Sequence, residues 1–428
     1  MLWAAIECLQ KTHPEWDLYV YCDVSCDADM LAKHARSRFN VDIMASFKVV
    51  PLTRRHLLVP SGYPRLTMLC QAVASVIVAL EALWHLVPDI WVDTTGWAFP
   101  YPLVRLLGCN VVAYVHYPTI SSDMLLRVRR REAAFNNSQL LASNGIFSYL
   151  KLIYYQLFGY WYGFCGGFAN VCMVNSSWTR NHVETIWWLG NAPLLVYPPC
   201  DTVSLQKIPL ERDTGVIASV AQFRPEKNHE IQLHALEYAR KVARETISDD
   251  VLRRAILGVK LLMVGGCRDD GDYQRVEMLK AKAAEAGLDE SCLEFHVNVP
   301  FEELQAVLGR SIAGIHSMRD EHFGISVVEY MAAGAIPIAH NSAGPQGDIV
   351  KAEQVDGTMQ QTGYLCETVE EYGDAIIDVV RMSDEERLRM SRAARIRSNR
   401  FSQVDFQQGW LDAMKPLLCV PTSKNKAL

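Results

Sequence analysis

Two glutamates flank a short turn that leads into an apolar helical run. Glu321 precedes Gly324, and Glu329 lies inside the run that ends at Ala332-Ala333-Gly334. A helix N-terminus offers unpaired backbone N–H groups and a partial positive charge, so it binds phosphate well. Glu329 would lie roughly 6–8 Å along the helix axis, where a carboxylate suits sugar hydroxyls better than phosphate. The spacing alone is common by chance, but together with Phe323 and the glycines it predicts a nucleotide-sugar site.

Two cations follow the first strand expected in the second half of the chain. Arg224 and Lys227 follow the expected strand Val216–Ala221, around the start of the expected helix Glu226–Arg244. An arginine can clamp a diphosphate through two parallel hydrogen bonds, and a lysine supplies a point charge. Because a departing nucleoside diphosphate gains negative charge, both cations would stabilise the transition state. The alternative is an ordinary solvated loop.

A histidine and a glycine-containing loop complete the candidate chemistry. His116 ends the expected strand Val111–His116, where it could contact the sugar or an acceptor hydroxyl, although a structural hydrogen bond would also explain it. The loop around Gly344 follows the expected strand Ile336–Ala339. It could close over the nucleotide because glycine permits close backbone approach, or it could be a plain turn.

A basic cluster stands out in a chain with a formal net charge of −6: Arg127, Arg129, Arg130 and Arg131. It could attract anionic lipid headgroups or a lipid pyrophosphate, or it could be a solvated helix face. The predicted acceptor or membrane side comprises His116, Tyr117, Asp123, Arg129 and Arg130, and Asp123 could instead cap a helix. The negative net charge argues against general nucleic-acid binding.

The cysteines and acidic pairs do not form a metal-binding pattern. The twelve cysteines include no CxxC pair, and no histidine pair completes a zinc site around Cys22 and Cys26. We interpret them as reduced core residues of a cytosol-facing protein. Asp269-Asp270 is the nearest acidic pair to the site and is better explained as a turn. We therefore expect no metal and no other cofactor.

Short apolar strands alternate with helices along the whole chain, a pattern typical of parallel sheets covered on both faces. Besides those given above, the expected strands are Leu18–Tyr21, Phe47–Val50, Ile90–Asp93, Val171–Asn175, Leu194–Tyr197, Lys260–Val264, Leu293–Val297 and Ala313–His316. Further helices are expected at Tyr273–Ala286, Phe301–Leu308 and Val369–Arg381. This α/β pattern predicts two doubly wound Rossmann-like domains that face each other across a cleft, where ligands usually bind.

We expect the first domain over residues 1–200 and the second over 201–400, with 401–428 packing back on the first. Two prolines near Asp201 suit a connection between domains. Met1–Leu9 is expected to be a helix with no strand before it, so the first domain lacks its opening strand. The uncharged segment Leu152–Val174 allows three interpretations: a buried helix plus strand, a helix lying in a membrane surface, or a membrane span.

The motifs resemble the retaining GT-B glycosyltransferases of family 4. More closely, they resemble the GDP-mannose-dependent α-1,2-mannosyltransferases of dolichol-linked oligosaccharide assembly in asparagine-linked glycosylation. The matching strings are HYPTISSDML (116–125), NSSWTRNH (175–182), YPPCDT (197–202), QFRPEKNHEIQLHAL (222–236) and AGAIPIAHNSAGPQGDIV (333–350). The resemblance implies metal-independent transfer of the fourth and fifth mannoses from GDP-mannose to a dolichol-diphosphate-linked Man3GlcNAc2. It also implies the cytosolic face of the endoplasmic reticulum membrane, with other mannosyltransferases as partners and no nucleic acid.

The resemblance also assigns roles to residues. The implied donor-binding set is Arg224 and Lys227 for the diphosphate, Phe323, Gly324 and Ile325 at the phosphate, Glu329 for the ribose, and Gly344. The implied catalytic set is Glu321, which would contact the donor mannose, His116, Arg224 and Lys227. The family also has a membrane anchor, a first strand and a Gly-rich loop ahead of the helix at Met1, and we expect a chain truncated before that helix. Three alternatives stay open: a GT-B transferase that uses another nucleotide sugar, a non-catalytic partner in a glycosyltransferase assembly, and a soluble nucleotide-sugar sensor.

Overall fold

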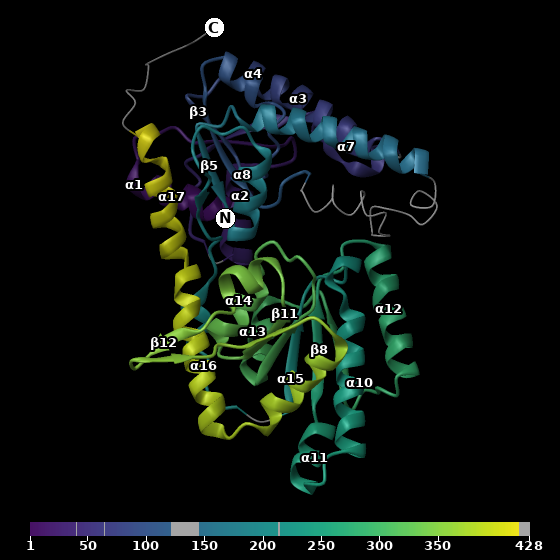
Figure 1. Cartoon of the computed structure of the whole chain (residues 1–428). Helices are drawn as coiled ribbons and strands as arrows, with labels where there is room; N and C mark the ends of the chain where they lie inside the picture. The colour runs from purple at the N-terminus through teal and green to yellow at the C-terminus, as the bar shows by residue number, and fades with distance from the viewer. Residues whose placement is uncertain (40, 64, 121–144, 213–214, 419–428) are drawn as a thin grey trace. The chain divides into compact units, whose positions relative to one another are not determined.

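The computed structural model describes residues 1–39, 41–63, 65–120, 145–212 and 215–418 (Figure 1). These residues form two compact units, which are described separately. The first contains Met1–Tyr197 together with the described residues from Gln407 onwards. The second contains Pro198–Phe406. Both are α/β units built on parallel sheets.

The first unit contains a pair of strands and a sheet of four. Strands β1 (Tyr19–Asp23) and β2 (Lys48–Leu52) pair in parallel, and β3 (Ile90–Asp93), β4 (Asn110–Val115), β5 (Val171–Val174) and β6 (Leu194–Leu195) pair in that order, also in parallel. Its helices are α1 (Leu2–Thr12), α2 (Ala28–Phe39), α3 (Thr67–His85), α4 (Tyr101–Leu106), α7 (Gly145–Gly166) and α8 (Ser177–Ile186). All six strands expected here are confirmed within a few residues. The residues of β4 from Val111 to Val115 are buried, as expected for a parallel strand covered on both faces.

The segment Leu152–Val174 folds as a helix followed by a strand. Helix α7 ends at Gly166, and the chain continues after a turn into β5. A Cβ atom on Gly166 would lie 2.2 Å from the Trp187 ring, so this position accepts only glycine without rearrangement. The interpretation of this segment as one continuous membrane span is therefore wrong. Within the described residues, α3 is the helix that is long and apolar enough to cross a membrane, and 44% of its most apolar stretch is buried.

The second unit is a six-stranded parallel sheet in the order β14-β11-β10-β7-β8-β9. The strands are β7 (Val216–Val220), β8 (Lys260–Gly265), β9 (Leu293–Val297), β10 (Ala313–His316), β11 (Ile336–His340) and β14 (Tyr364–Cys366), with an antiparallel hairpin of β12 (Glu353–Val355) and β13 (Thr358–Gln360). Its helices are α9 (Thr202–Leu205), α10 (His229–Glu245), α11 (Asp250–Leu257), α12 (Asp270–Glu285), α13 (Phe301–Arg310), α14 (Ile325–Ala333), α15 (Val369–Arg381) and α16 (Asp384–Ser398), and α17 (Gln403–Leu418) begins at its end.

Two local expectations in the second unit are corrected. The helix expected at Glu226–Arg244 begins instead at His229, because Pro225–Lys227 forms a 3-10 turn and Asn228 adopts a left-handed conformation with φ of 49°. Asp269 is not part of a free turn. Its carboxylate caps α12 by accepting a hydrogen bond of 3.1 Å from the backbone N–H of Asp272.

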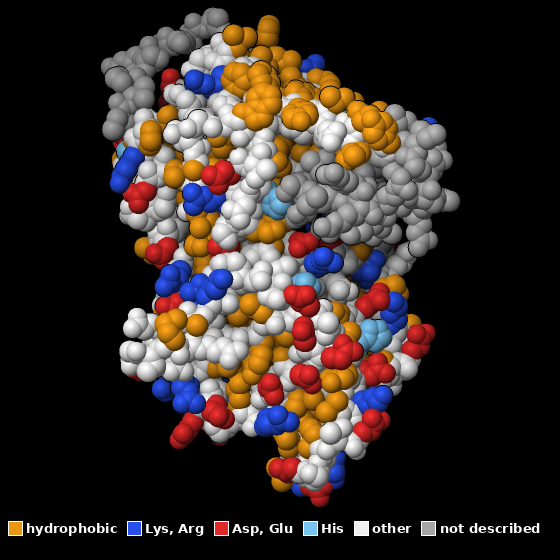
Figure 2. Space-filling view, viewed as in Figure 1, with side chains coloured by type: hydrophobic (Ala, Val, Ile, Leu, Met, Phe, Trp, Pro, Cys, Tyr) orange, Lys and Arg blue, Asp and Glu red, His pale blue; other side chains and the backbone are white. Residues whose placement is uncertain are grey.

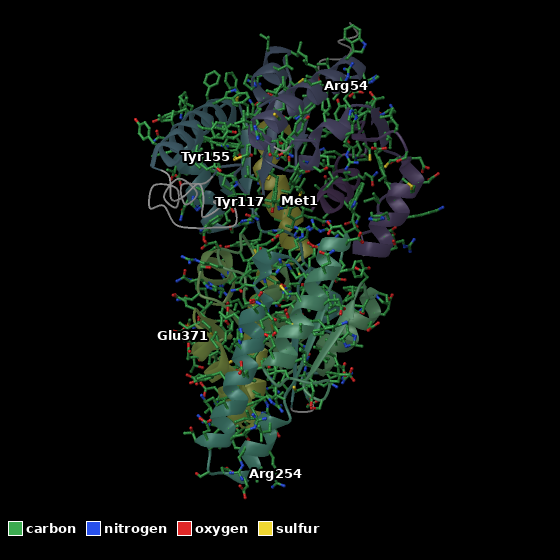
Figure 3. All side chains as sticks on the ribbon, turned by 90° about the vertical axis from the view of Figure 1, so that its right-hand side faces the viewer. Met1, Arg54, Tyr117, Tyr155, Arg254 and Glu371 are labelled. Carbon is green, nitrogen blue, oxygen red and sulfur yellow. The ribbon has the colours of Figure 1, made fainter. Side chains whose placement is uncertain are left out.

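The strand order brings the motif-bearing loops of the second unit to one edge. Strands β7, β10 and β11 are neighbours and run in parallel, so the loops at their carboxyl ends emerge together. Those loops hold Arg224 and Lys227 after β7, Glu321 to Gly324 after β10, and Gly344 after β11. Figure 3 shows the side chains of both units as sticks, with Tyr117 after β4 and Tyr155 on α7 labelled in the first unit.

Candidate functional site

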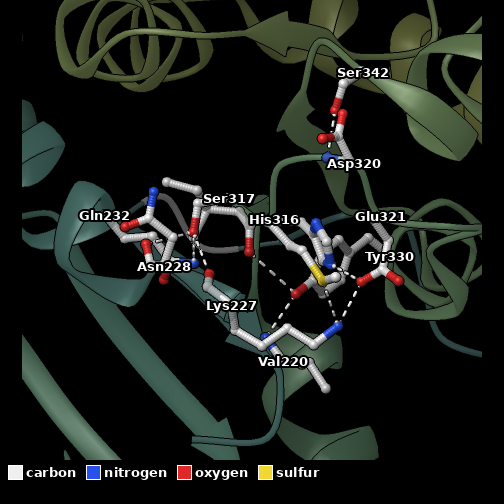
Figure 4. A network of polar contacts seen from close by, with 12 residues as sticks. Val220, Lys227, Asn228, Gln232, His316, Ser317, Asp320, Glu321, Tyr330 and Ser342 are labelled. Carbon is white, nitrogen blue, oxygen red and sulfur yellow. Dashed lines mark hydrogen bonds and ion pairs between the residues drawn. The ribbon is translucent and has the colours of Figure 1, made fainter. Parts of the chain in front are cut away.

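The loop that carries Lys227 is fixed to the end of β10 by a serine. The Ser317 hydroxyl lies 2.9 Å from the carbonyl oxygens of both Lys227 and Asn228, and it accepts a hydrogen bond of 2.8 Å from Gln232 Nε2 (Figure 4). Asn228 needs this support, because a non-glycine residue with positive φ is uncommon. The turn therefore holds Lys227 in one place relative to β10.

Lys227 and a histidine converge on one oxygen of Glu321. Lys227 Nζ lies 2.5 Å from Glu321 Oε2, and His316 Nε2 lies 3.1 Å from the same oxygen (Figure 4). His316 is the last residue of β10, and its side chain is 2% exposed. Its backbone carbonyl accepts a hydrogen bond of 3.0 Å from the Tyr372 hydroxyl. Three elements of the second unit thus fix this polar cluster.

The cluster keeps Glu321 ionised. Burial alone would raise the pKa of Glu321, but the hydrogen bond and charge of His316, together with Lys227, hold that pKa well below its ordinary value of 4.5. A second histidine, His229, stays neutral because burial and the nearby His316 and Lys227 lower its pKa to about 4. The site therefore presents a carboxylate and an ammonium group around neutral pH.

The turn before α14 depends on two glycines. Gly324 caps the helix with φ of 106°, a conformation that residues with a side chain rarely adopt. Gly344 donates its backbone N–H to the Glu321 carbonyl at 2.9 Å, and a Cβ on Gly344 would lie 2.3 Å from the Phe323 carbonyl oxygen. The loops after β10 and β11 therefore pack backbone against backbone, and Phe323 is buried between them.

Two arginines anchor one end of helix α14. At its C-terminus, Arg395 donates to the carbonyl oxygens of Ala332 at 3.0 Å and Ala333 at 2.9 Å, and Arg212 also donates to Ala333. Cations are favourable there because the helix C-terminus carries partial negative charge. The first backbone N–H groups of α14, at the opposite end, have no intrahelical acceptor. The Ile325 side chain at this end is exposed, so its contribution to a site would come from its backbone.

Glu329 differs from Glu321 in its charge at neutral pH. It lies in the second turn of α14 as a partly buried residue. Burial of its carboxyl group, and the nearby Asp201, raise its pKa from 4.5 to about 7. A group that is half protonated near neutral pH can donate to or accept from a sugar hydroxyl.

Arg224 lies in the same loop as Lys227 without joining the Glu321 cluster. Its guanidinium Nη1 is 3.7 Å from Glu226 Oε1, a weak contact. Its buried Nε has no hydrogen-bond partner among the described residues. Because buried polar atoms are normally paired, this group is suited to take up an anionic ligand.

The first unit holds the other predicted residues. His116 directly follows β4, which ends one residue earlier than expected. Its ring meets that of Tyr114 edge-on at 4.9 Å, and its carbonyl lies 3.4 Å from the Thr179 hydroxyl. The Tyr117 ring stacks on Trp178 at 5.8 Å. The other acceptor-side residues, Asp123, Arg129 and Arg130, lie outside the described residues.

Sequence reasoning missed His316. The residue ends an apolar strand expected at its observed bounds, and it stands five positions before Glu321. A spacing of five residues does not predict a contact between two side chains in a loop. The turn that follows β10 brings the His316 and Glu321 side chains together. A histidine at the carboxyl end of a strand, in the unit that also carries the cations, was the available signal. Across the described residues, no group of three or more His, Cys, Asp or Glu side chains could hold a metal ion.

Comparisons with known proteins cover both units. Residues 1–187 match the family model described as ALG11 mannosyltransferase N-terminus, and residues 202–397 match Glycosyl transferases group 1. The chain is 40% identical over 423 residues to the Homo sapiens GDP-Man:Man(3)GlcNAc(2)-PP-Dol alpha-1,2-mannosyltransferase, covering 97% of this chain and 83% of that protein. The Caenorhabditis elegans protein of the same name is 38% identical, with 98% and 88% covered. The chain belongs to this mannosyltransferase family.

The likeness to solved structures agrees with the GT-B fold expected for the mannosyltransferase family. Sucrose-phosphate synthase from Thermosynechococcus elongatus matches with a TM-score of 0.64 at 14% identity, covering 97% of this chain and 92% of that one. Anabaena HepE, solved with UDP and glucose, matches with a TM-score of 0.58 at 15% identity, with 97% and 95% covered. At these identities the matches show the fold alone. The predicted fold class of two Rossmann-like α/β domains is therefore confirmed. The family match and the 40% identical relative show that the chain is a glycosyltransferase.

Proposed function

We propose that this chain transfers mannose from GDP-mannose to dolichol-diphosphate-linked Man3GlcNAc2, adding the fourth and fifth mannoses in α-1,2 linkage. Curated relatives about 40% identical to it carry the name of that activity. The structural observation that carries the proposal is the convergence of Lys227 and Glu321 beside the N-terminus of α14. An ammonium group and a helix N-terminus suit a diphosphate, and a carboxylate next to them suits a hexose hydroxyl.

The donor would bind to six groups of the second unit. Arg224 and Lys227 would hold the diphosphate, with the backbone N–H groups of Gly324 and Ile325 at its phosphate oxygens. Lys227 can contact the diphosphate while it stays paired with Glu321, because an ammonium group has three N–H donors. Glu321 accepts one of them, and the Met318 sulfur lies 3.2 Å from the same nitrogen. Glu321 would contact the donor mannose, and Glu329 would hold the ribose hydroxyls. Phe323 and Gly344 would support the turn at Gly324.

The chemistry would retain the configuration at the anomeric carbon. The bond between the mannose C1 and the diphosphate oxygen breaks, and the acceptor hydroxyl forms the new bond from the same face. The departing phosphate oxygen takes the hydroxyl proton. Arg224, Lys227 and the α14 N-terminus would stabilise the charge on GDP, so in this proposal the chain's own groups replace a metal ion.

The acceptor would meet the first unit. His116 and Tyr117 are the described residues proposed for it, and Asp123, Arg129 and Arg130 remain predicted for the same side. Because a dolichol-linked acceptor is held in a membrane, we place the reaction at the endoplasmic reticulum membrane on its cytosolic face. Other mannosyltransferases of the same assembly are the proposed protein partners.

The test is a transfer assay with radiolabelled GDP-mannose and a lipid-diphosphate-linked Man3GlcNAc2, run with and without EDTA. We expect two α-1,2-linked mannoses to be added, unaffected by EDTA, and lost in Lys227→Ala. Lys280→Ala is the matched control, because Lys280 is an exposed lysine of α12 that pairs with neighbouring Glu277. GDP-mannose binding without transfer would favour the non-catalytic partner. Displacement of GDP-mannose by UDP-GlcNAc at equal concentration would favour the other nucleotide sugar.

A further inference from the structure

Helix α3 has two apolar faces, and only one of them is buried. Ala72, Val78, Ala79 and Ala82 are among its buried residues. A second apolar stripe, at helical spacing on the opposite side, is exposed: Val73, Ile77, Leu80 and Trp84. The Trp84 residue is 90% exposed. A helix of a water-soluble surface would carry polar residues on that side.

Helix α7 repeats this arrangement. Tyr155, Phe158, Tyr162 and Cys165 face the core of the first unit. The opposite side exposes Tyr149, Leu157, Tyr160 and Phe164, and the Tyr160 residue is 64% exposed. No charged residue occurs between Leu152 and Gly166. Two helices with exposed aromatic and aliphatic stripes are more than the scattered apolar residues of an ordinary surface.

The two helices lie side by side in the first unit. Met68 and Val76 of α3 and Leu152 and Tyr154 of α7 pack around the same buried cluster. Figures 1 and 2, which share one view, show hydrophobic side chains gathered over α3, α4 and α7. Leu106 at the end of α4 is 81% exposed in the same region. The charged residue inside α3, Glu81, is buried, and its carboxylate accepts hydrogen bonds from Thr53 and Arg54.

We propose that the exposed faces of α3 and α7, with Leu106 of α4, form a surface that lies against a lipid bilayer. Tyrosine and tryptophan combine an apolar ring with a polar tip, which suits the boundary between headgroups and acyl chains. The inference rests on the proposed function, since the dolichol-linked acceptor would be held in that bilayer. Helix α3 lies on the membrane rather than crossing it, because nearly half of its apolar stretch is buried in protein.

The experiment is flotation of the full chain with phosphatidylcholine vesicles. The test variant is Leu80→Ser/Trp84→Ser/Tyr160→Ser/Phe164→Ser, which keeps every buried core residue. The control variant is Val251→Ser/Met359→Ser, which removes two exposed apolar side chains from the second unit. We expect the test variant to lose vesicle partitioning on the order of tenfold or more, and the control to match the unmodified chain. Unchanged circular dichroism and GDP binding would show that the test variant is folded.

Two results with the test variant would overturn this surface. One is equal flotation of the test variant and the unmodified chain. The other is a dimer of the unmodified chain in gel filtration that is lost in the test variant, while neither the unmodified chain nor the variant binds vesicles. That result would show that the surface joins two copies of the chain. The proposed function is tested separately: transfer to a water-soluble acceptor analogue without vesicle binding keeps the function and rejects the surface. Vesicle binding without any transfer keeps the surface and rejects the function.

Discussion

Lys227 and Glu321 form an ion pair 2.5 Å long although they are 94 residues apart and follow different strands. Their side chains are 20% and 13% exposed. We expect Lys227→Met to lower the free energy of unfolding by about 1–3 kcal/mol, because it leaves a largely buried carboxylate without its cation. Urea unfolding of Lys227→Met, Glu321→Gln and the double variant gives the coupling, expected at about 0.5–3 kcal/mol.

Lys227→Met should also weaken GDP binding by at least about tenfold, since a charged hydrogen bond to the diphosphate is lost. Isothermal titration with GDP measures this loss, and Lys280→Met serves as the control. A coupling near zero together with unchanged GDP affinity would contradict both the pair and its role.

The buried His316 side chain contacts the Glu321 carboxylate and holds it in place, so His316 is a positioning residue. The low pKa of Glu321 stabilises the fold above its unfolded value of 4.5, and this stability is lost as pH falls below it. We expect His316→Leu to reduce that dependence, because the hydrogen bond at 3.1 Å is lost. The measurement is the urea midpoint between pH 3 and pH 7 for the unmodified chain, His316→Leu and Glu321→Gln.

In transfer assays, His316→Leu should lower kcat more than it raises KM for GDP-mannose, because the displaced carboxylate would contact the mannose and not the nucleotide. His316→Gln, which can still donate to Glu321, should recover part of kcat. A purely structural role for His316 would leave the pH profile of stability parallel to that of the unmodified chain.

Most strands were predictable because their apolar residues stand out between polar segments. Ala313–His316, which is buried throughout, has its expected bounds. Leu293–Val297, which alternates apolar and polar residues, also has its expected bounds. Strands β12, β13 and β14 were missed. Each has three residues, and most of these are at least partly exposed, so no apolar pattern marks them.

The site was predictable as motifs but not as contacts. The alternation of strands and helices places the loops at one sheet edge, which is why the positions of Lys227 and Glu321 could be anticipated. The contact between His316 and Glu321 depends on the turn between them, where Asp320 adopts a left-handed conformation with φ of 57°. The start of α10 was misplaced because Ser317 holds Asn228 in a conformation that propensity disfavours.

Glu329 should make stability depend on pH in the opposite direction to Glu321. Its folded pKa of about 7 lies above the ordinary 4.5, so the folded state binds the proton more tightly. Stability from this group is fully present below pH 4.5 and is lost as pH rises through about 7. Urea unfolding of Glu329→Gln between pH 5 and pH 8 should lack this decline. A decline of equal size in Glu329→Gln would assign it to another group.

Donor binding should respond to the same titration. If the ribose hydroxyls donate to Glu329, the carboxylate form binds them, so GDP affinity should rise from pH 6 to pH 8. Glu329→Gln should bind GDP more weakly and with no rise over this range. The lysine control, Lys280→Met, should keep the rise. Affinity that is flat in the unmodified chain would remove Glu329 from the ribose site.

Gly344 tests whether the backbone contact behind the turn is needed. A Cβ atom at this position would lie 2.3 Å from the Phe323 carbonyl oxygen, so Gly344→Ala must move one of the two loops. We expect it to destabilise the fold by about 1–3 kcal/mol and to weaken GDP binding, because the N–H of Gly344 also bonds to the Glu321 carbonyl.

The matched control is Gly309→Ala in α13, whose Cβ would lie 3.6 Å from Ile208. That change should be neutral or stabilising, since alanine favours a helix. Thermal unfolding and GDP titration of both variants decide the point, and equal behaviour would show that the loops adapt without cost.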